Sequence, residues 1–372
     1  MAQGNKVLSS QSLTPELPTL PFDLIAEILC RLPVKFLFQL RCVCKFFHSL
    51  ISDPKFAKNH LQLSTKRHHL MIASMNNLAD LVLYDSPIHS VFSTSTIVTQ
   101  TQLYPPNTLT NGSKYVDVLC SCDGIFCCFL KPGSYVLWNP SIRKFKLLPP
   151  LEIRRRHDTF FISFGYDHFI DKYKVIDFAS KNDVFVYTLG TDYWTRIEDI
   201  PHDYRIYGRG VFVSGTVNWY AEGESDDYLH FILSLALEDE SYRQLFLPDS
   251  DNESYSWRLD VLRDCLCVFE TSDMFLNVWI MNKYGNEESW TKLFHVPNMQ
   301  DLHGFEDNCW WWSLGLYLSE DDRLLMEFND FESYDRKLAV YDSKTVTFNI
   351  LEFQNNCAQK HPIVYIESLI SP

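Results

Sequence analysis

A strand–turn–strand unit recurs six times in the larger part of this chain, from residue 65 to residue 372. Each unit is an apolar run, a turn containing Asp, Asn or Gly, and a second apolar run. The units begin at Leu81, Val136, Val186, Leu233, Val278 and Leu338, so that successive starts lie 45 to 60 residues apart. A repeat of this length indicates one supersecondary element that is stacked several times.

A second pair of strands is expected between successive units, as in VDVLCSCDGIFCCFL from Val116. Four strands per repeat form one blade of a β-propeller. We expect six blades, with seven blades or a distorted ring as the alternatives. One strand-like segment near the C-terminus, residues 363–370, has no partner in its own repeat. We expect it to complete the first blade, because closing the ring removes exposed sheet edges.

The N-terminal part follows another pattern. Residues 1–14 are polar without periodicity and are expected to be disordered. In residues 15–64, apolar side chains recur every three or four positions, which predicts helices. A first helix is expected over 20–32, a second over 34–51, and a short third over 54–60.

Three short helices bury little surface by themselves. This helical module, residues 15–64, therefore either packs on the rest of the chain or docks onto another protein. A helical prefix that only covers the β domain is the plainer alternative.

The helical module resembles the F-box of plant F-box proteins. The resemblance is carried by Leu20-Pro21, Leu24, Ile28-Leu29 and Leu32-Pro33-Val34-Lys35, and then by Leu37, Leu40-Arg41, Val43-Cys44-Lys45, Leu50-Ile51, Asp53-Pro54 and Phe56. The chain has Phe47 where the family usually has tryptophan, which keeps a large aromatic side chain. In this family the module docks on a small Skp-type adaptor, which links it to a cullin scaffold and a RING subunit.

The resemblance implies a set of adaptor-binding residues in this chain. They are Leu20, Pro21, Leu24, Ile28, Leu32, Pro33, Val34 and Leu37. Each of these side chains could instead belong to the internal core of the helical module.

Residues 65–372 resemble the F-box-associated, kelch-like propeller domain that follows the F-box in a large plant family. Four elements in order carry the resemblance: Cys122-Asp123-Gly124, Trp138-Asn139-Pro140, Phe164-Gly165-Tyr166-Asp167, and Gly215 with Val217-Asn218-Trp219. The fold class expected is therefore a multidomain α plus all-β protein, with a three-helix F-box followed by a propeller.

Charge and cysteine content restrict the partners and the compartment. The net charge of −14 argues against binding to nucleic acid or to an anionic membrane surface. The 11 cysteines include no C-x-x-C pair and no zinc-ligand spacing, so we expect reduced, buried thiols and no metal. The N-terminus lacks the apolar run of a signal peptide, and no run of 18 apolar residues occurs. A location in the cytoplasm or the nucleus is expected.

Catalytic motifs are missing from the sequence. It contains no G-x-S-x-G, P-loop or dinucleotide fingerprint, and Gly208 and Gly210 precede a strand without a following helix. Acidic clusters at 222–227, 249–253 and 320–322 lie in expected turns, where solvated carboxylates are typical. No cofactor and no catalytic residue are expected.

Two hypotheses follow. The first is a non-catalytic substrate receptor of an SCF-type ubiquitin ligase, which brings a protein target of unknown identity to ubiquitination and ubiquitin-dependent degradation. The second is a propeller hydrolase or carbohydrate-binding module with a helical prefix.

Overall fold

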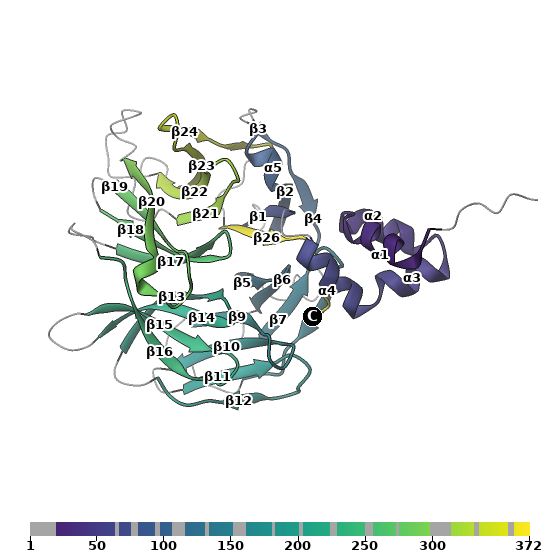
Figure 1. The fold of residues 1–372 in the computed structure, drawn as a ribbon, viewed down its shortest axis with the longest axis horizontal. Helices are drawn as coiled ribbons and strands as arrows, with labels where there is room; N and C mark the ends of the chain where they lie inside the picture. The colour runs from purple at the N-terminus through teal and green to yellow at the C-terminus, as the bar shows by residue number, and fades with distance from the viewer. Residues whose placement is uncertain are drawn as a thin grey trace, which may run out of the picture.

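The computed structural model describes most of the chain between residue 20 and the C-terminus. The described ranges are 20–63, 67–75, 81–93, 97–105, 116–130, 134–151, 161–180, 183–200, 204–223, 229–249, 256–272, 275–297, 314–330, 335–355 and 361–372. The tail expected at 1–14 lies outside them. A group of helices precedes a ring of strands (Figure 1). None of the described helices is long and apolar enough to span a membrane.

The helical module has four helices, in place of the expected three. They are α1 (Phe22–Cys30), α2 (Val34–Arg41), α3 (Lys45–Ile51) and α4 (Pro54–Leu63). The single helix expected over 34–51 is therefore wrong, because the chain leaves the helical conformation after Arg41. The N–H groups of Cys42 and Val43 close α2 through bonds to carbonyls three residues back, and Cys44 is extended at φ −156°.

The break has a packing reason. An unbroken helix of this length would be about 27 Å long and would carry its last turns away from the module. Because the chain turns at residues 42–44, α3 lies against both α2 and α4.

Six four-stranded antiparallel sheets form the ring, which confirms the expected propeller of six blades (Figure 1). From its innermost to its outermost strand, blade 1 contains β26 (His361–Ile366), β1 (His68–Met75), β2 (Leu81–Pro87) and β4 (Thr101–Leu103). In the same order, blade 2 contains β5 (Val116–Cys122), β6 (Ile125–Leu130), β7 (Ser134–Asn139) and β8 (Lys144–Leu147). Blade 3 contains β9 (Phe161–Asp167), β10 (Lys172–Ser180), β11 (Asp183–Thr188) and β12 (Trp194–Arg196).

The remaining blades have the same arrangement, again from the innermost strand outward. Blade 4 contains β13 (Tyr204–Val213), β14 (Thr216–Gly223), β15 (His230–Ala236) and β16 (Tyr242–Phe246). Blade 5 contains β17 (Ser256–Leu262), β18 (Cys265–Thr271), β19 (Phe275–Met281) and β20 (Trp290–Pro297), with a short 3-10 helix η1 (Glu287–Ser289) before β20. Blade 6 contains β21 (Leu314–Leu318), β22 (Arg323–Asp330), β23 (Asp335–Asp342) and β24 (Thr347–Ile350).

The C-terminal strand closes the ring, as expected. β26 pairs with β1 in antiparallel register, with Ile366 opposite His68. The strand ends at Ile366, four residues earlier than the expected 363–370. A second closure joins blade 6 to blade 1 farther out, where β25 (Glu352–Phe353) pairs in parallel with β3 (Ile97–Val98).

The first of the six sequence units is not a hairpin, which corrects that expectation. β2 ends at Pro87, and the residues that follow form the short helix α5 (Ile88–Val91). Proline has no N–H to donate to the ladder, so it ends the strand. Ile88 and Val91 are then buried in a cluster that contains residues of β1, β23 and β25. The other five units are the outer two strands of blades 2 to 6.

Polar contacts join neighbouring blades on the side of the ring where the turns between the two inner strands lie. Lys174 of blade 3 donates through Nζ to the Leu237 carbonyl, 2.6 Å away, beside β15 of blade 4. The Tyr284 hydroxyl of blade 5 donates to Asn218 Oδ1 of blade 4 at 2.7 Å. These contacts fix each sheet against the next one.

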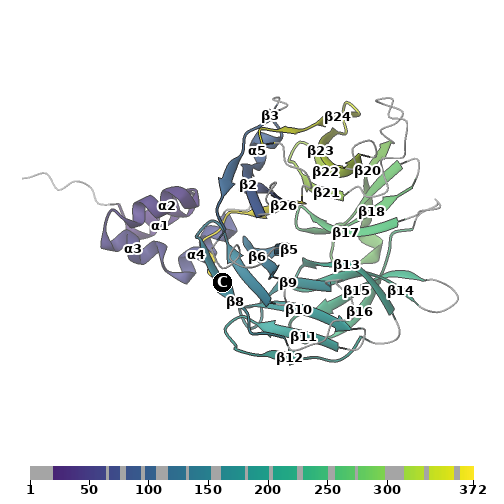
Figure 2. The same cartoon turned by 180° about the vertical axis from the view of Figure 1, so that it is seen from behind.

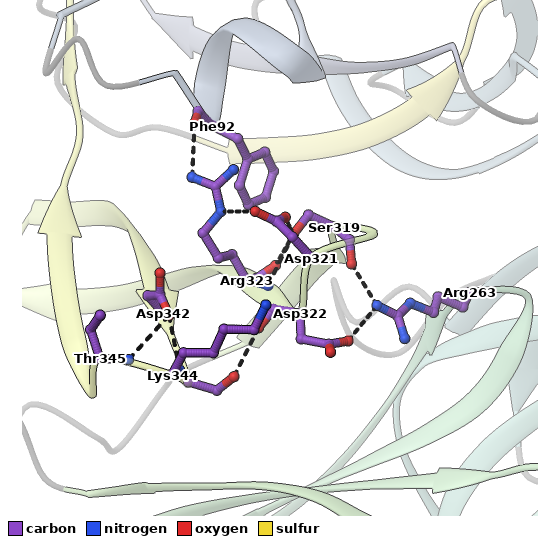
Figure 3. A network of polar contacts seen from close by, with 10 residues as sticks. Phe92, Arg263, Ser319, Asp321, Asp322, Arg323, Asp342, Lys344 and Thr345 are labelled. Atoms are coloured by element: carbon purple, nitrogen blue, oxygen red, sulfur yellow. Dashed lines mark hydrogen bonds and ion pairs between the residues drawn. The ribbon is translucent and has the colours of Figure 1, made fainter.

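Figure 3 shows the same kind of contact between blades 5, 6 and 1. Arg263 donates through Nη2 to the Ser319 carbonyl at 2.6 Å and to Asp322 Oδ1 at 2.7 Å. Arg323 pairs with Asp321 and donates to the Phe92 carbonyl at 2.9 Å. The acidic cluster at 320–322 is thus part of the joint between blades. Of the other two acidic clusters, only Glu222, Gly223 and Asp249 lie within the described residues.

Candidate functional site

Between residues 20 and 51, the helical module exposes large apolar side chains. Phe22 is 70% exposed and Val43 is 66% exposed. The whole set, which we name the exposed apolar surface, consists of Leu20, Phe22, Leu24, Ile28, Phe36, Val43 and Phe46. Phe22 of α1 and Phe46 of α3 are in contact, with ring centroids 5.1 Å apart. In both views α4 lies next to the ring, and α1 to α3 project beyond it (Figures 1 and 2).

The adaptor-binding residues expected from the resemblance divide into three groups. Leu20, Pro21, Leu24 and Ile28 are exposed. Leu32 and Pro33 are half-buried, at the link between α1 and α2. Val34 and Leu37 are fully buried. The structure therefore brings Leu20, Leu24 and Ile28 into the exposed apolar surface and leaves Pro21 exposed next to Leu20 in the chain. It places Val34 and Leu37 in the core.

Four members of the exposed apolar surface were missed by the sequence reasoning. They are Phe22, Phe36, Val43 and Phe46. A signal was present, because each is a large apolar residue that lies off the apolar spacing of the helices expected over 20–32 and 34–51. Such a residue has no buried position in a small helical module and remains exposed unless another chain covers it.

The opposite side of the module packs on the propeller. Leu29, Val34, Leu37, Ile51 and Phe56 share one buried cluster with residues of blades 2 and 3. Leu369 and Ile370, from the end of the chain, belong to the same cluster. The core of the helical module and the core of the ring are thus continuous.

Glu367, which directly follows β26, joins the module to the ring. Its Oε2 accepts a hydrogen bond from the Val34 N–H at 3.2 Å, where α2 begins. A carboxylate at this position accepts a hydrogen bond from an N–H group that has no partner within the helix. Its negative charge also interacts favourably with the positive end of the helix dipole. The Glu367 N–H donates to the Arg67 carbonyl at 3.2 Å, so the end of β26 and the start of β1 both contact the module.

Arg67 and His60 contact the backbone carbonyls that follow the C-terminal end of α1. Arg67 donates through Nη1 to the Leu32 carbonyl at 2.6 Å, and through Nη2 to the Arg31 carbonyl. His60 is buried, with its Nε2 2.9 Å from the Leu32 carbonyl oxygen. Burial lowers the pKa of His60, and the neighbouring Arg67 lowers it further. The imidazole is therefore neutral at pH 7, which suits its place beside a guanidinium.

Residues 368–370 are hydrogen-bonded to blade 2, chiefly through the buried side chain of Asn139. Asn139 donates through Nδ2 to the carbonyls of Ser368 and Ile370, at 3.2 and 2.8 Å. Gly124 packs against the same segment, and a Cβ there would lie 2.4 Å from the Ile366 carbonyl oxygen. Its φ of +79° also favours glycine. Asn139 and Gly124 both belong to the elements that carried the resemblance to the F-box-associated domain.

A further contact ties α4 to blade 3. Lys58 forms an ion pair with Asp171, in the turn between β9 and β10, and lies against the Tyr166 ring. With the contacts of Arg67, Glu367 and Asn139, this contact holds the module in one orientation on blades 1 to 3. The exposed apolar surface is therefore presented at a fixed angle to the ring.

The described residues show little that suits redox or metal chemistry. Their nine cysteines form no disulfide with one another. No three His, Cys, Asp or Glu side chains within the described ranges are placed to hold a metal ion.

Comparisons with known proteins point to the same two parts of the chain. A family model described as "F-box domain" matches residues 17–59, and one described as "F-box associated beta propeller domain" matches residues 68–372. An Arabidopsis thaliana F-box/kelch-repeat protein is 26% identical over 95% of this chain and 96% of its own length. The Arabidopsis F-box protein CPR1 is 24% identical over 95% of this chain and 89% of its own length.

Solved structures are more distant. TolB from Acinetobacter baumannii is 12% identical, covers 82% of this chain and 73% of its own, and superposes with a TM-score of 0.38. At that score the likeness adds nothing to the functional argument.

Proposed function

The chain belongs to the family of F-box proteins with an F-box-associated β-propeller domain, and from this premise we propose that it is the substrate-recognition subunit of an SCF-type cullin ubiquitin ligase. The helical module binds a Skp-type adaptor and, through it, the cullin and RING subunits. The propeller binds the protein target. A location in the cytoplasm or the nucleus goes with this proposal.

One observation carries the proposal beyond family membership. Residues 20–51 share a buried cluster with the ring and still leave seven large apolar side chains exposed. Each such side chain contributes about 1.5–3 kcal/mol when it is fully buried. A partner that covers this surface therefore gains binding free energy from the burial of several apolar side chains, and the contacts between the module and the ring stay unchanged.

The mechanism is positional. A target held on the propeller has a raised effective concentration near the ubiquitin-conjugating enzyme at the other end of the assembly. Positioning requires a stiff connection between the two binding surfaces. The contacts of Arg67, Glu367 and Asn139 supply this connection, and the transfer needs no reacting side chain from this chain.

The test is co-purification of the full chain with a Skp-type adaptor. Leu24 and Ile28 are 46% and 51% exposed, so Leu24→Asp with Ile28→Asp should leave the fold intact. We expect the double variant to bind the adaptor at least about a hundredfold more weakly, because two apolar contacts are replaced by charges that must be desolvated. The melting temperature, measured in parallel, should stay within a few degrees.

A matched control changes two apolar residues of similar exposure in blade 4, Leu229→Asp with Phe246→Asp. The strands of blade 4 lie at the lower left of Figure 1 and the helices at its right, and this variant should bind the adaptor like the wild type. The proposal is wrong if the wild-type chain purifies without an adaptor, or if both double variants bind it equally. The hydrolase or carbohydrate-binding hypothesis predicts the first of these outcomes, a chain that purifies without an adaptor.

A further inference from the structure

The outermost strand of blade 2, β8, has an open edge. It pairs with β7 on one side, and no strand of the described residues pairs with its other side. The Leu148 N–H donates to the Tyr135 carbonyl at 2.8 Å, so every second residue counted back from Leu148 directs its N–H and carbonyl toward β7. Phe145 and Leu147 lie between these residues, and their N–H and carbonyl groups therefore point outward.

The residues with outward backbone groups also expose apolar side chains. Phe145 is 43% exposed and Leu147 is 58% exposed. They lie opposite Trp138 and Val136 of β7, which are buried in a cluster with residues of blade 1. Residues that lie opposite each other in a ladder share one face of the sheet. Phe145 and Leu147 therefore continue this buried face outward to the edge of the blade, where it is exposed.

The alternate positions of β8 are lysines, which lie on the other face of the blade. Lys144 is exposed, with its Nζ 3.4 Å from Ser371 Oγ, and Figure 2 shows β8 beside the C-terminus. Lys146 is half-buried, with its Nζ 6.0 Å from the centre of the Tyr187 ring. Arg143 precedes the strand and is exposed. Within the described residues, none of these three cations forms an ion pair.

The outermost strands of the other blades lack this combination. Among the outermost strands of the six described blades, β8 alone carries two exposed large apolar residues. On β16 one such residue, Phe246, is exposed, and its N–H donates to Glu287 Oε1 at 2.8 Å. On β12 the cation Arg196 is paired with Asp183 and Asp199. Open backbone groups, exposed apolar side chains and unpaired cations thus coincide on β8.

This pattern favours one kind of incoming strand. Lysines on an edge discourage pairing with most strands, whereas exposed apolar side chains favour it. In an antiparallel ladder added to β8, Phe145 and Leu147 each exchange a pair of backbone hydrogen bonds with the facing residue. Lys144 and Lys146 occupy the positions where facing side chains approach most closely, and opposite charges attract there. A strand with acidic residues opposite the lysines therefore satisfies both features.

We propose that β8 is a docking edge for an extended acidic segment of the target polypeptide, which adds to the four strands of blade 2. The segment alternates acidic residues, which face Lys144 and Lys146, with apolar residues, which face Phe145 and Leu147. Main-chain hydrogen bonds supply affinity in this mode of binding, and the alternate side chains supply specificity. The net charge of the chain is −14, so the cations at 143–146 form a local positive patch on an acidic protein, and this patch attracts an acidic segment. The inference rests on the proposed function, since it assigns the segment to the target.

The experiment uses the full chain, co-purified with its adaptor, and a fluorescein-labelled peptide of alternating glutamate and valine about ten residues long. Binding is measured by fluorescence anisotropy at two salt concentrations. In a second peptide lysine replaces glutamate, and in a third each valine is N-methylated, which removes the donors that face the Phe145 and Leu147 carbonyls. We expect the acidic peptide to bind, more weakly at the higher salt concentration. The other two peptides should bind at least about tenfold more weakly.

Two variants test the two features of the edge. Lys144→Glu with Lys146→Glu should weaken binding of the acidic peptide by at least about tenfold and strengthen binding of the lysine peptide. Leu147→Pro removes one outward N–H while the bonds to β7 stay in place, which an edge strand tolerates, and it should also weaken binding of the acidic peptide. If Leu147→Pro fails to fold, the lysine variant remains informative. The matched control is Lys292→Glu, at an exposed lysine over the Trp279 ring on β20, the outermost strand of blade 5, and it should bind like wild type.

Equal binding of the acidic and N-methylated peptides would overturn the proposal, as would equal binding of the acidic peptide by wild type and the lysine variant. Absence of binding by wild type would also overturn it. Sedimentation of the same complex tests the other occupant. A dimer that Leu147→Pro dissociates would assign β8 to a second copy of this chain and overturn the assignment to a target.

Adaptor co-purification, recorded for each variant, separates this result from the proposed function. The β8 variants should retain the adaptor, and Leu24→Asp with Ile28→Asp should lose the adaptor while still binding the acidic peptide. Release of the adaptor by the acidic peptide would assign β8 to the adaptor and would likewise overturn the assignment to a target.

Discussion

Replacing Asp260 by asparagine should stabilise the protein, and more so as the pH rises. Asp260 lies on β17 opposite Cys267 of β18. Its Oδ1 accepts a hydrogen bond from the Val261 N–H at 2.7 Å, a contact that the asparagine oxygen can keep. Burial raises the pKa of the carboxyl from 3.8 to about 7, and the Val261 contact opposes this only in part.

The size of this change in stability follows from the difference between the pKa of Asp260 in the folded state and its pKa in the unfolded state. A carboxyl whose pKa is raised on folding binds more protons in the folded state between pH 4 and pH 7, so stability falls as the pH rises through that window. Each pKa unit corresponds to about 1.4 kcal/mol, which gives at most about 4 kcal/mol lost by pH 8. Roughly 2–3 kcal/mol of this loss should develop between pH 5 and pH 8.

The assay is urea unfolding of wild type and Asp260→Asn, followed by tryptophan fluorescence at half-unit steps from pH 5 to pH 8. The free energy of unfolding of the variant minus that of wild type should grow by about 2–3 kcal/mol across this range. This difference should level off above pH 7. Asp192→Asn, at an exposed turn residue of blade 3, is the control for the replacement of one aspartate by asparagine. Parallel curves for Asp260→Asn and wild type would refute the reasoning, because they would show that Asp260 is ionised throughout.

Two other perturbations test the joint at residues 368–370 and the packing of two glycines in β13. Asn139→Leu leaves the Ser368 and Ile370 carbonyls without the Asn139 donor, which should lower the free energy of unfolding by about 2 kcal/mol. Amide hydrogen exchange of residues 367–371 should become faster, while adaptor binding is kept. Unchanged exchange would contradict the role assigned to Asn139. Gly210→Ala should cost about 1–3 kcal/mol through the contact with Ser163, measured as a lower melting temperature. Gly208→Ala, where a Cβ meets nothing within 4 Å, should cost only about 1 kcal/mol, and equal losses for the two variants would argue against the packing explanation.

Much of the fold could be predicted because the governing signals are local. Alternating apolar residues and short turns locate the strands, and their recurrence along residues 65–372 predicts a ring of six blades. The C-terminal strand was found because it lacked a partner within its own repeat. Two predictions were wrong, the single helix over 34–51 and the hairpin that would have continued through 88–91, and they have one cause. An apolar spacing identifies residues that will be buried, but it does not say whether the chain stays in one element to bury them.

The candidate site could be predicted only in part. The sequence identified Leu24 and Ile28, which are exposed, together with Val34 and Leu37, which are buried. These pairs look alike in the sequence, because both lie on apolar stripes of short helices. They differ in the structure because Leu369 and Ile370 return from the far end of the chain and pack in the cluster that contains Val34 and Leu37.

The sequence by itself determined the two parts of this protein, the strands of the ring and the helical character of its N-terminal module. Only the tertiary structure decided which apolar side chains of that module stay exposed and how the module is fixed to the ring. Backbone propensity and hydrophobic periodicity act over a few neighbouring residues, whereas these two outcomes depend on contacts between residues that are tens to hundreds of positions apart.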